Sequence, residues 1–220
     1  MFIGHVAVGL FSKRIDRTLP LGWLVAAPMF LDLLWPLLLA LGIETVRIDP
    51  GNTAMTPLDL HDYPWSHSLL MAAVWSVVFA ALFYARHRTT RGAAVIGAGV
   101  FSHWVLDFVT HRPDMPLYPG SDTYLGLGLW NSVPATVLVE GTLFAASVAL
   151  YAKSTRARTR TGSMAWWSFV GLLVLIYVGN IFSPPPPAVT AVIGAGFALW
   201  LLGPWGAWIE RHRENVSPTA

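Results

Sequence analysis

The sequence predicts an all-α fold, a polytopic membrane helix bundle of about six transmembrane helices with an N-terminal short or half helix. Hydrophobic residues make up 55% of the 220 positions and charged residues only 12%, which is typical of a chain whose solvent is mostly lipid. Several apolar runs approach the roughly twenty residues that one helix needs to cross a bilayer core. Basic residues gather between alternate runs, a pattern typical of membrane proteins. We therefore expect a single integral membrane domain over residues 1–220.

The predicted elements follow one another from the N-terminus. The first eleven residues are apolar and contain Gly4 and Gly9, so they can enter the membrane as a half helix packed closely against its neighbours. Pro28 and Pro36 can kink the span that follows. The expected transmembrane spans are residues 21–41, 66–84, 92–109, 129–151, 164–182 and 188–209.

The last two spans carry two further local signals. Four consecutive prolines at 184–187 predict a rigid turn outside the membrane between them. Small residues four positions apart, such as Ala191 and Ala195, predict close packing of the last helix against another helix.

Charged residues divide the connecting segments into two groups, and this division predicts the topology. With six spans, every basic segment falls on one side of the membrane, which the positive-inside rule identifies as cytoplasmic. Both termini are then cytoplasmic and the opposite face is acidic, whereas an odd number of spans would scramble the separation. The basic segments contain Lys13, Arg14, Arg17, Arg86, Arg88, Arg91, Lys153, Arg156, Arg158, Arg160, Arg211 and Arg213, and the acidic loops contain Glu44, Asp49, Asp59, Asp62, Asp114 and Asp122.

The composition also excludes several classes of function. The chain has no cysteine, which excludes disulfides, thiolate metal sites and cysteine nucleophiles. Its basic residues form short blocks between apolar runs and are not interleaved with aromatic residues, so nucleic acid is not the expected partner.

Ionisable residues inside the predicted spans are the candidates for function, because each costs at least a few kcal/mol in lipid unless it is paired, hydrated or bound. His103 and Asp107 lie four residues apart, and therefore on one face of one helix. His103 and Asp107 lie in the outer half of the third span, and His67 opens the second span from the outer side as well. Asp32 lies near the middle of the first span. Three helices thus offer imidazole or carboxylate groups at overlapping depths. His5 joins this set if the N-terminal segment enters the membrane.

Imidazole and carboxylate groups together suit zinc, or manganese where carboxylates dominate. A divalent metal, zinc before others, is therefore the expected cofactor. A second interpretation stays open, because a histidine or aspartate in a membrane helix also serves as a hydrogen-bond partner between helices. Glu140 stands apart in the sequence, and a structural or proton-handling role suits it as well as a catalytic one. His61, Asp62 and His111 fall in loops, where solvated surface positions are expected.

Short motifs occur in a recognisable order in the first half of the chain. They are Gly4-His5, an aspartate after a proline in the first span, Tyr-Pro-Trp-Ser-His-Ser at 63–68 and Ser-His-Trp-Val-Leu-Asp at 102–107. This order resembles the bacterial membrane-bound metal-dependent hydrolase family, and the resemblance covers residues 1–119. Residues 120–220 supply additional transmembrane helices and look like an uncharacterised subgroup of polytopic inner-membrane proteins.

Two positions depart from the family pattern. Met29 follows the proline directly, and Asp32 comes three residues later. Asp62 follows the loop histidine where the family has an arginine soon after.

The resemblance implies a multi-pass protein of the bacterial inner (cell) membrane that carries out metal-dependent hydrolysis. A site in the outer leaflet favours a lipid-like ester or phosphoester as substrate, since such a molecule can enter sideways from the bilayer. The expected metal ligands are His5, Asp32, His67, His103 and Asp107, and the candidate catalytic residues are Asp62 and Glu140.

Two other functions use the same buried residues. In a small ion-coupled transporter, the aspartates and histidines would relay protons or coordinate a cation. In a non-catalytic membrane scaffold, they would only lock helices together. The expected partner is the lipid bilayer in every case, and the sequence leaves open whether the chain forms homo-oligomers.

Overall fold

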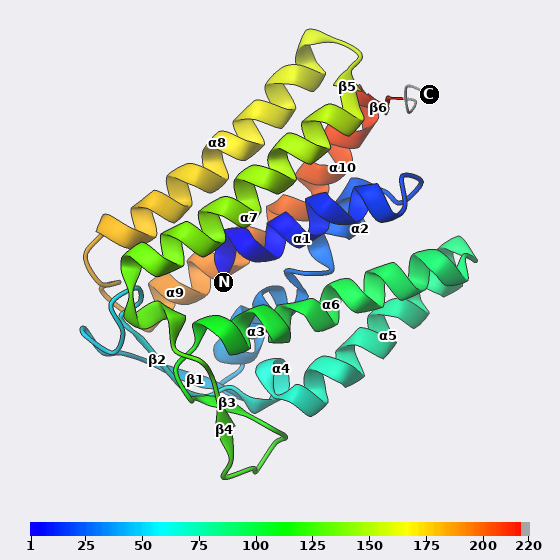
Figure 1. Cartoon of the computed structure of the whole chain (residues 1–220). Helices are drawn as coiled ribbons and strands as arrows, with labels where there is room; N and C mark the ends of the chain where they lie inside the picture. The colour runs from blue at the N-terminus through cyan, green and yellow to red at the C-terminus, as the bar shows by residue number, and fades with distance from the viewer. Residues whose placement is uncertain (217–220) are drawn as a thin grey trace.

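Within residues 1–216, the part of the chain that the structure describes, five helices are long and apolar enough to cross a membrane (Figure 1). The computed structural model confirms the predicted all-α polytopic bundle and agrees with five of the predicted spans within a few residues. These long helices are α5 (Leu69–His87), α6 (Thr90–Thr110), α7 (Val133–Ser154), α8 (Arg160–Phe182) and a continuous stack of α9 (Val189–Ala198), the 3-10 turn η2 (Leu199–Leu201) and α10 (Leu202–His212).

The expected first span, residues 21–41, is not one helix, so this part of the prediction is wrong. The chain forms α2 (Leu21–Ala26) and α3 (Phe30–Ala40), with a break between them. Pro28 lies in the break, and it has no amide hydrogen to continue the helical ladder, while its ring crowds the turn before it. Pro36 lies inside α3 without ending that helix. The chain therefore breaks at Pro28, where the sequence predicted only a kink.

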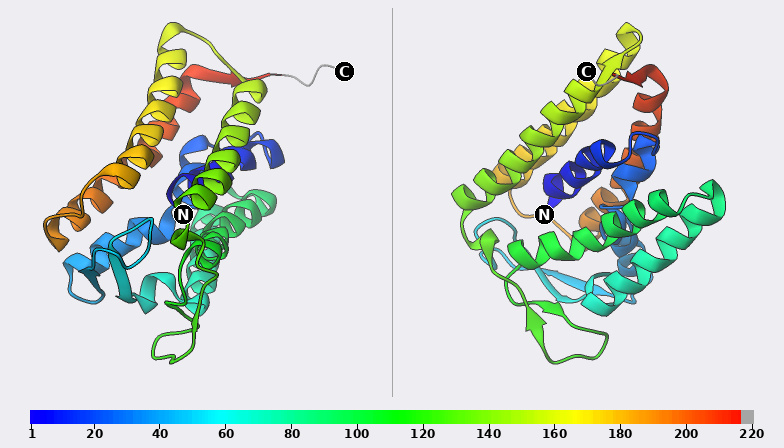
Figure 2. Two further views of the ribbon diagram at one scale, coloured as in Figure 1. Left: turned by 60° about the vertical axis from the view of Figure 1, so that its left-hand side comes forward. Right: turned by 45° about the vertical axis from the view of Figure 1, so that its right-hand side comes forward.

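The two halves of the chain interlock. Helices α5 and α6 form an antiparallel pair on one side of the bundle. On the other side, α7 packs against α1 and α8 packs against α10 (Figure 2). The broken pair joins the halves, because α2 packs against α10 and α3 packs against α9.

The N-terminal helix α1 (Phe2–Ile15) lies inside the bundle, where it contacts α7, α2 and α6 (Figure 1). Met1 is only 4% exposed, and Leu10 packs in the core with Leu24 and Val100. The expected half helix is therefore present and carries His5 into the interior. Helix α1 runs inward from its basic end, so Met1 is buried, and the cytoplasmic placement of the two termini stays a prediction.

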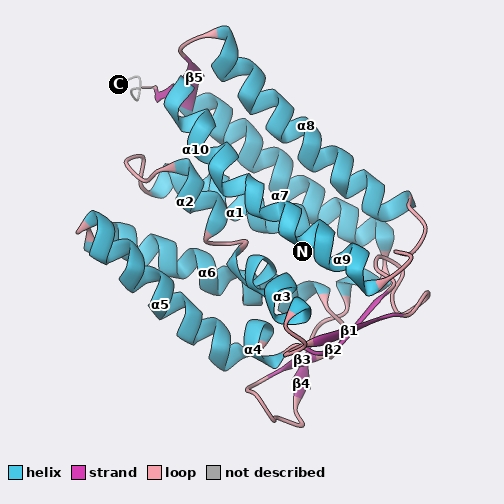
Figure 3. Ribbon diagram, turned by 180° about the vertical axis from the view of Figure 1, so that it is seen from behind, coloured by secondary structure: helices cyan, strands magenta, loops and turns pink. Residues whose placement is uncertain are grey.

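Short two-stranded sheets cap the two ends of the bundle (Figure 3). At one end, β1 (Thr45–Ile48) pairs with β2 (Leu58–Asp62), and β3 (Met115–Pro116) pairs with β4 (Tyr124–Leu125). At the other end, β5 (Thr155–Ala157) pairs with β6 (Arg213–Asn215). The remaining short helices are α4 (Pro64–His67) and the 3-10 turn η1 (Leu129–Asn131).

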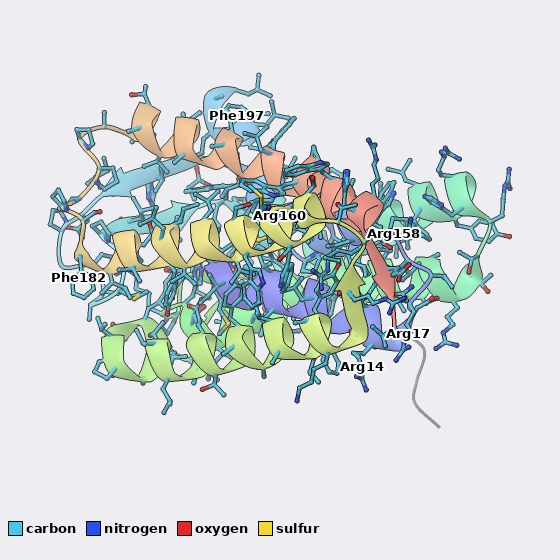
Figure 4. All side chains as sticks on the ribbon, turned by 90° about the horizontal axis from the view of Figure 1, so that it is seen from above. Arg14, Arg17, Arg158, Arg160, Phe182 and Phe197 are labelled. Atoms are coloured by element: carbon cyan, nitrogen blue, oxygen red, sulfur yellow. The ribbon has the colours of Figure 1, made fainter. Side chains whose placement is uncertain are left out.

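The predicted division of charge is visible in the folded chain. Arg14, Arg17 and Arg158 lie toward the same end of the bundle, and Phe182, at the end of α8, lies at the opposite end (Figure 4). The acidic hairpins β1–β4 lie at the end away from these arginines.

Candidate metal centre

Asp107, on α6, is the centre of a buried cluster of ionisable side chains. It is only 2% exposed. Its Oδ1 atom lies 3.0 Å from His5 Nε2 and accepts from the amino group of Met1 at 2.6 Å. Its Oδ2 atom lies 2.9 Å from His103 Nε2, because residues four apart share one face of a helix. The structure thus brings α1 and α6 together at this carboxylate.

His103 directs its Nε2 atom toward the carboxylates. Its Nδ1 atom lies 2.7 Å from the carbonyl oxygen of Pro28. A carbonyl only accepts, so Nδ1 carries the proton and Nε2 of the neutral ring is unprotonated. The break between α2 and α3 leaves the Pro28 carbonyl free for this contact. Nε2 of His103 is buried without a hydrogen-bond partner among the described residues, although it lies beside Asp107.

His67, on α4, also directs its Nε2 atom toward the cluster. Its Nδ1 atom lies 2.6 Å from Ser66 Oγ, and the Ser66 hydroxyl donates to Glu44 Oε2 at 2.7 Å. Serine has one hydroxyl proton, so Nδ1 of His67 must donate to Ser66 and Nε2 is again unprotonated in the neutral ring. Such an outer acceptor is typical of histidines that bind metal ions.

Glu44 anchors this chain of contacts from the loop between α3 and β1. Burial raises the pKa of the Glu44 carboxyl, and the donors that surround it act in the opposite direction. These donors are the Ser66 hydroxyl and the backbone N–H groups of Trp65 and Ser66, the latter two both at 2.8 Å. The sequence analysis assigned Glu44 only to an acidic surface, whereas it is 1% exposed.

Asp32, on α3, faces both of these histidines. Its Oδ1 atom lies 3.7 Å from His67 Nε2 and 3.8 Å from His103 Nε2. His67 Nε2 also lies 3.9 Å from Asp107 Oδ2. These separations are too long for hydrogen bonds. They are close to the roughly 3.4 Å between two ligands that each lie about 2.1 Å from one tetrahedral zinc ion.

Two overlapping groups of side chains could therefore hold a metal ion. His5, His103 and Asp107 form the first group, and Asp32, His67 and His103 form the second, with the ligand atoms in each group within 4.8 Å of one another. All five residues that the sequence nominated as metal ligands thus lie in one cluster.

His111 is a member of the cluster that the sequence analysis missed, and its expected solvated position is wrong. It is 3% exposed, and its Nε2 atom lies 3.9 Å from Asp107 Oδ2. Its Nδ1 atom lies 3.1 Å from Asp114 Oδ1, which also accepts from the Tyr63 hydroxyl at 3.0 Å. The signal was the spacing, because His111 follows Asp107 by the same four residues that separate His103 from Asp107.

The two candidate catalytic residues lie in different places. Asp62 is exposed on β2, where Oδ2 lies 3.4 Å from the Thr45 hydroxyl, and it lines a separate pocket of about 180 Å³ near the β3–β4 hairpin. Glu140, on α7, is 1% exposed and lines the same cavity as Asp107. Its Oε2 atom has no hydrogen-bond partner among the described residues.

The cluster forms part of the wall of a cavity of about 690 Å³. The ionisable residues that line it are Asp32, His67, Asp107, His111 and Glu140. Most of the remaining wall is apolar, and its largest part comes from residues 172–205, which include parts of α8, α9 and α10. A buried polar cluster thus opens into an apolar chamber of a size that suits a small-molecule ligand.

The fold and this cluster define a polytopic α-helical membrane protein with a buried histidine–aspartate centre that could hold a metal ion. The chain belongs to the YdjM inner membrane protein family, whose model matches residues 1–184. No curated protein and no solved structure matches the chain. The family match extends beyond residues 1–119 and includes α1 to α8, and thus every residue of the cluster. It assigns the chain to an inner-membrane family.

Proposed function

We propose that this protein is a membrane-embedded metal-dependent hydrolase that acts on a lipid-like ester or phosphoester at the external leaflet. The observation that carries the proposal is the set of buried imidazole nitrogens that face carboxylate oxygens. A nitrogen lone pair directed at a carboxylate is repelled unless a proton or a metal ion lies between the two atoms. His67 and His103 have this arrangement toward Asp32 and Asp107.

The donor set fits zinc, which takes imidazole nitrogen and carboxylate oxygen ligands. His67, His103, Asp32 and Asp107 would hold the ion, and His5 would bind Asp107 or the ion from α1. A bound divalent ion lowers the pKa of a coordinated water molecule and polarises the bond to be cleaved. Contacts at Nδ1 would leave the Nε2 atom of each ring free to bind the ion. These contacts come from Glu44 through Ser66 for His67, from the Pro28 carbonyl for His103 and from Asp114 for His111.

Glu140 is the proposed general base, and Asp62 is left out because it does not line the cavity of the cluster. Oε2 of Glu140 is buried and unpartnered among the described residues, so it is free to accept a proton from a water molecule in the cavity. The apolar wall of the cavity would exclude bulk water and strengthen the electrostatic contacts of the reacting group.

Hydrolysis in vesicles tests the function. We expect purified protein to hydrolyse either a fluorogenic lipid ester or a fluorogenic lipid phosphoester, and to lose this activity with a chelator. Glu140→Gln should lower kcat about 100-fold while zinc content stays unchanged, because general-base catalysis is worth roughly that factor. Full activity after complete metal removal would contradict the proposal.

The Glu44–Ser66–His67 chain should tune metal affinity. Ser66→Ala removes the acceptor of the His67 Nδ1 proton, so we expect zinc affinity to fall about 10- to 100-fold. The matched control is Ser102→Ala, because the Ser102 hydroxyl donates only to Gly99 within its own helix. Competition with a fluorescent zinc chelator measures both, and equal affinities for the two variants would count against the role of Ser66.

The external placement of the cluster is proposed from the positive-inside rule and can be tested by labelling. The chain has no native cysteine, so single cysteines report cleanly. We expect Asp122→Cys, in the β3–β4 hairpin, to react with an impermeant maleimide from outside the inner membrane. Thr90→Cys, at the first residue of α6 beside the basic turn from α5, should react only after permeabilisation. The reverse pattern would move the cluster to the cytoplasmic leaflet.

A further inference from the structure

We propose that the apolar arm of the cavity binds the hydrocarbon chain of a membrane lipid, with the polar linkage of that lipid beside the buried cluster. The inference rests on the proposed function only for the chemistry of the reacting group. Binding of the chain itself is argued from the shape and lining of the cavity.

The cavity is continuous from the cluster to the second-half helices. Asp32, Asp107 and His111 line one part of it. The other part, called here the chain slot, is lined on one side by residues between Leu172 and Ser183 and on the other by Val192, Ala195, Leu199 and Leu202. A ligand that fills the whole space must therefore combine a polar group with a long apolar segment.

The depth of the chain slot matches one leaflet. On α8 its lining runs from Ser183, just past the helix end, to Leu172. These eleven residue steps correspond to about 16 Å along a helix at 1.5 Å per residue. Half of a hydrocarbon core about 30 Å thick is about 15 Å. The slot therefore has the depth that an extended lipid chain occupies in its own leaflet.

Small residues keep the slot open. Ala191 and Ala195 line the cavity, so these positions do not form the close helix contact that their spacing predicted. The close approach of α9 to α3 occurs instead at Gly196, where an added Cβ would meet Pro36 at 2.8 Å. Leu201 lines the cavity and is 66% exposed, so the slot opens sideways toward the bilayer.

The cavity wall contains buried polar groups that could donate hydrogen bonds to the ester or phosphate linkage of a lipid. The Tyr177 hydroxyl and the Trp35 indole N–H are buried without hydrogen-bond partners among the described residues, and both side chains line the cavity. A buried donor without an acceptor is costly. The oxygens of an ester or phosphate group would satisfy these donors, whereas a purely apolar occupant would not.

Photo-crosslinking tests the slot without depending on catalysis. The full chain is reconstituted in vesicles of phosphatidylethanolamine and phosphatidylglycerol that contain phosphatidylethanolamine with a diazirine in one acyl chain. We expect adducts to concentrate on the slot residues of α8, α9 and α10, above the level at Leu175, which is 68% exposed and does not line the cavity.

A matched pair of variants separates the slot from the lipid-facing surface. Ile176→Trp fills the slot and should lower adduct yield at α9 and α10 about tenfold. Leu175→Trp adds the same side chain on the outer face of the same helix and should leave that yield unchanged. Ala195→Phe fills the slot from α9, so a folding defect of Ile176→Trp, detected by circular dichroism, does not decide the result.

Three outcomes decide the inference. Adducts that persist in His103→Ala support a slot that binds lipid even if the metal centre and the hydrolase proposal fail. Equal adduct yields at Leu175 and in the slot, with no effect of Ile176→Trp or Ala195→Phe, would overturn the inference. Crosslinks from slot positions to a second copy of the chain would also overturn it, because a helix would then occupy the slot.

Discussion

Asp107→Asn is expected to weaken zinc binding by at least about 100-fold, the largest effect of any single change in the cluster. One carboxylate oxygen contacts His5, and the other lies within 3.9 Å of the Nε2 atoms of His67, His103 and His111. Asparagine keeps the size of the side chain but removes the charge that an ion between these nitrogens needs. Competition with a chelator measures the loss.

Asp62→Asn is the matched control for this change. It removes the same charge from an exposed carboxylate outside the cavity, so zinc affinity should stay within about twofold of wild type. If Asp107→Asn and Asp62→Asn bound zinc equally well, Asp107 would be a structural hydrogen-bond acceptor, as the interhelical interpretation of the sequence requires.

Gly9→Ala is expected to cause a large loss of stability. An added Cβ at Gly9 would collide with the backbone carbonyl of Leu24 on α2. Backbone cannot move aside as a flexible side chain does, so we expect a loss of about 1–3 kcal/mol in the free energy of unfolding. Because α1 carries His5, zinc affinity should fall with it. Thermal unfolding in detergent, followed by circular dichroism, measures the change.

Gly171→Ala provides the control for Gly9→Ala. Gly171 also lies inside a helix, α8, but an added Cβ there meets no heavy atom within 4 Å. Alanine has the higher helix propensity, so stability should be unchanged or rise by up to about 1 kcal/mol. A Gly9→Ala variant as stable as Gly171→Ala would contradict the packing of α1 against α2.

The long helices could be predicted because length and apolar composition are local properties of the sequence. Residues 66–84 and 164–182 needed only those properties, and they became α5 and α8. The break at Pro28 was less predictable, since a proline kinks one membrane helix and ends another. The Pro28 carbonyl oxygen accepts a hydrogen bond from His103. These residues are 75 positions apart, so no local pattern predicts this contact.

The cluster was predictable where its members follow helical spacing. His103 and Asp107 were found because four residues bring side chains onto one face. The same rule applies to His111, but its place just after the end of α6 suggested a solvated loop. Glu44 could not be found, because its role depends on the tertiary contact with Ser66. The chain slot likewise depends on how α8, α9 and α10 are arranged in space.

Elemental analysis of the purified protein tests the metal centre most directly. Wild type should contain at least about one divalent ion per chain, with zinc the most abundant, as the imidazole and carboxylate donors favour. A variant with both His67→Ala and His103→Ala, purified in the same way, should contain almost none. Equal metal content in the two proteins would contradict the account, because the converging nitrogens would then hold no ion.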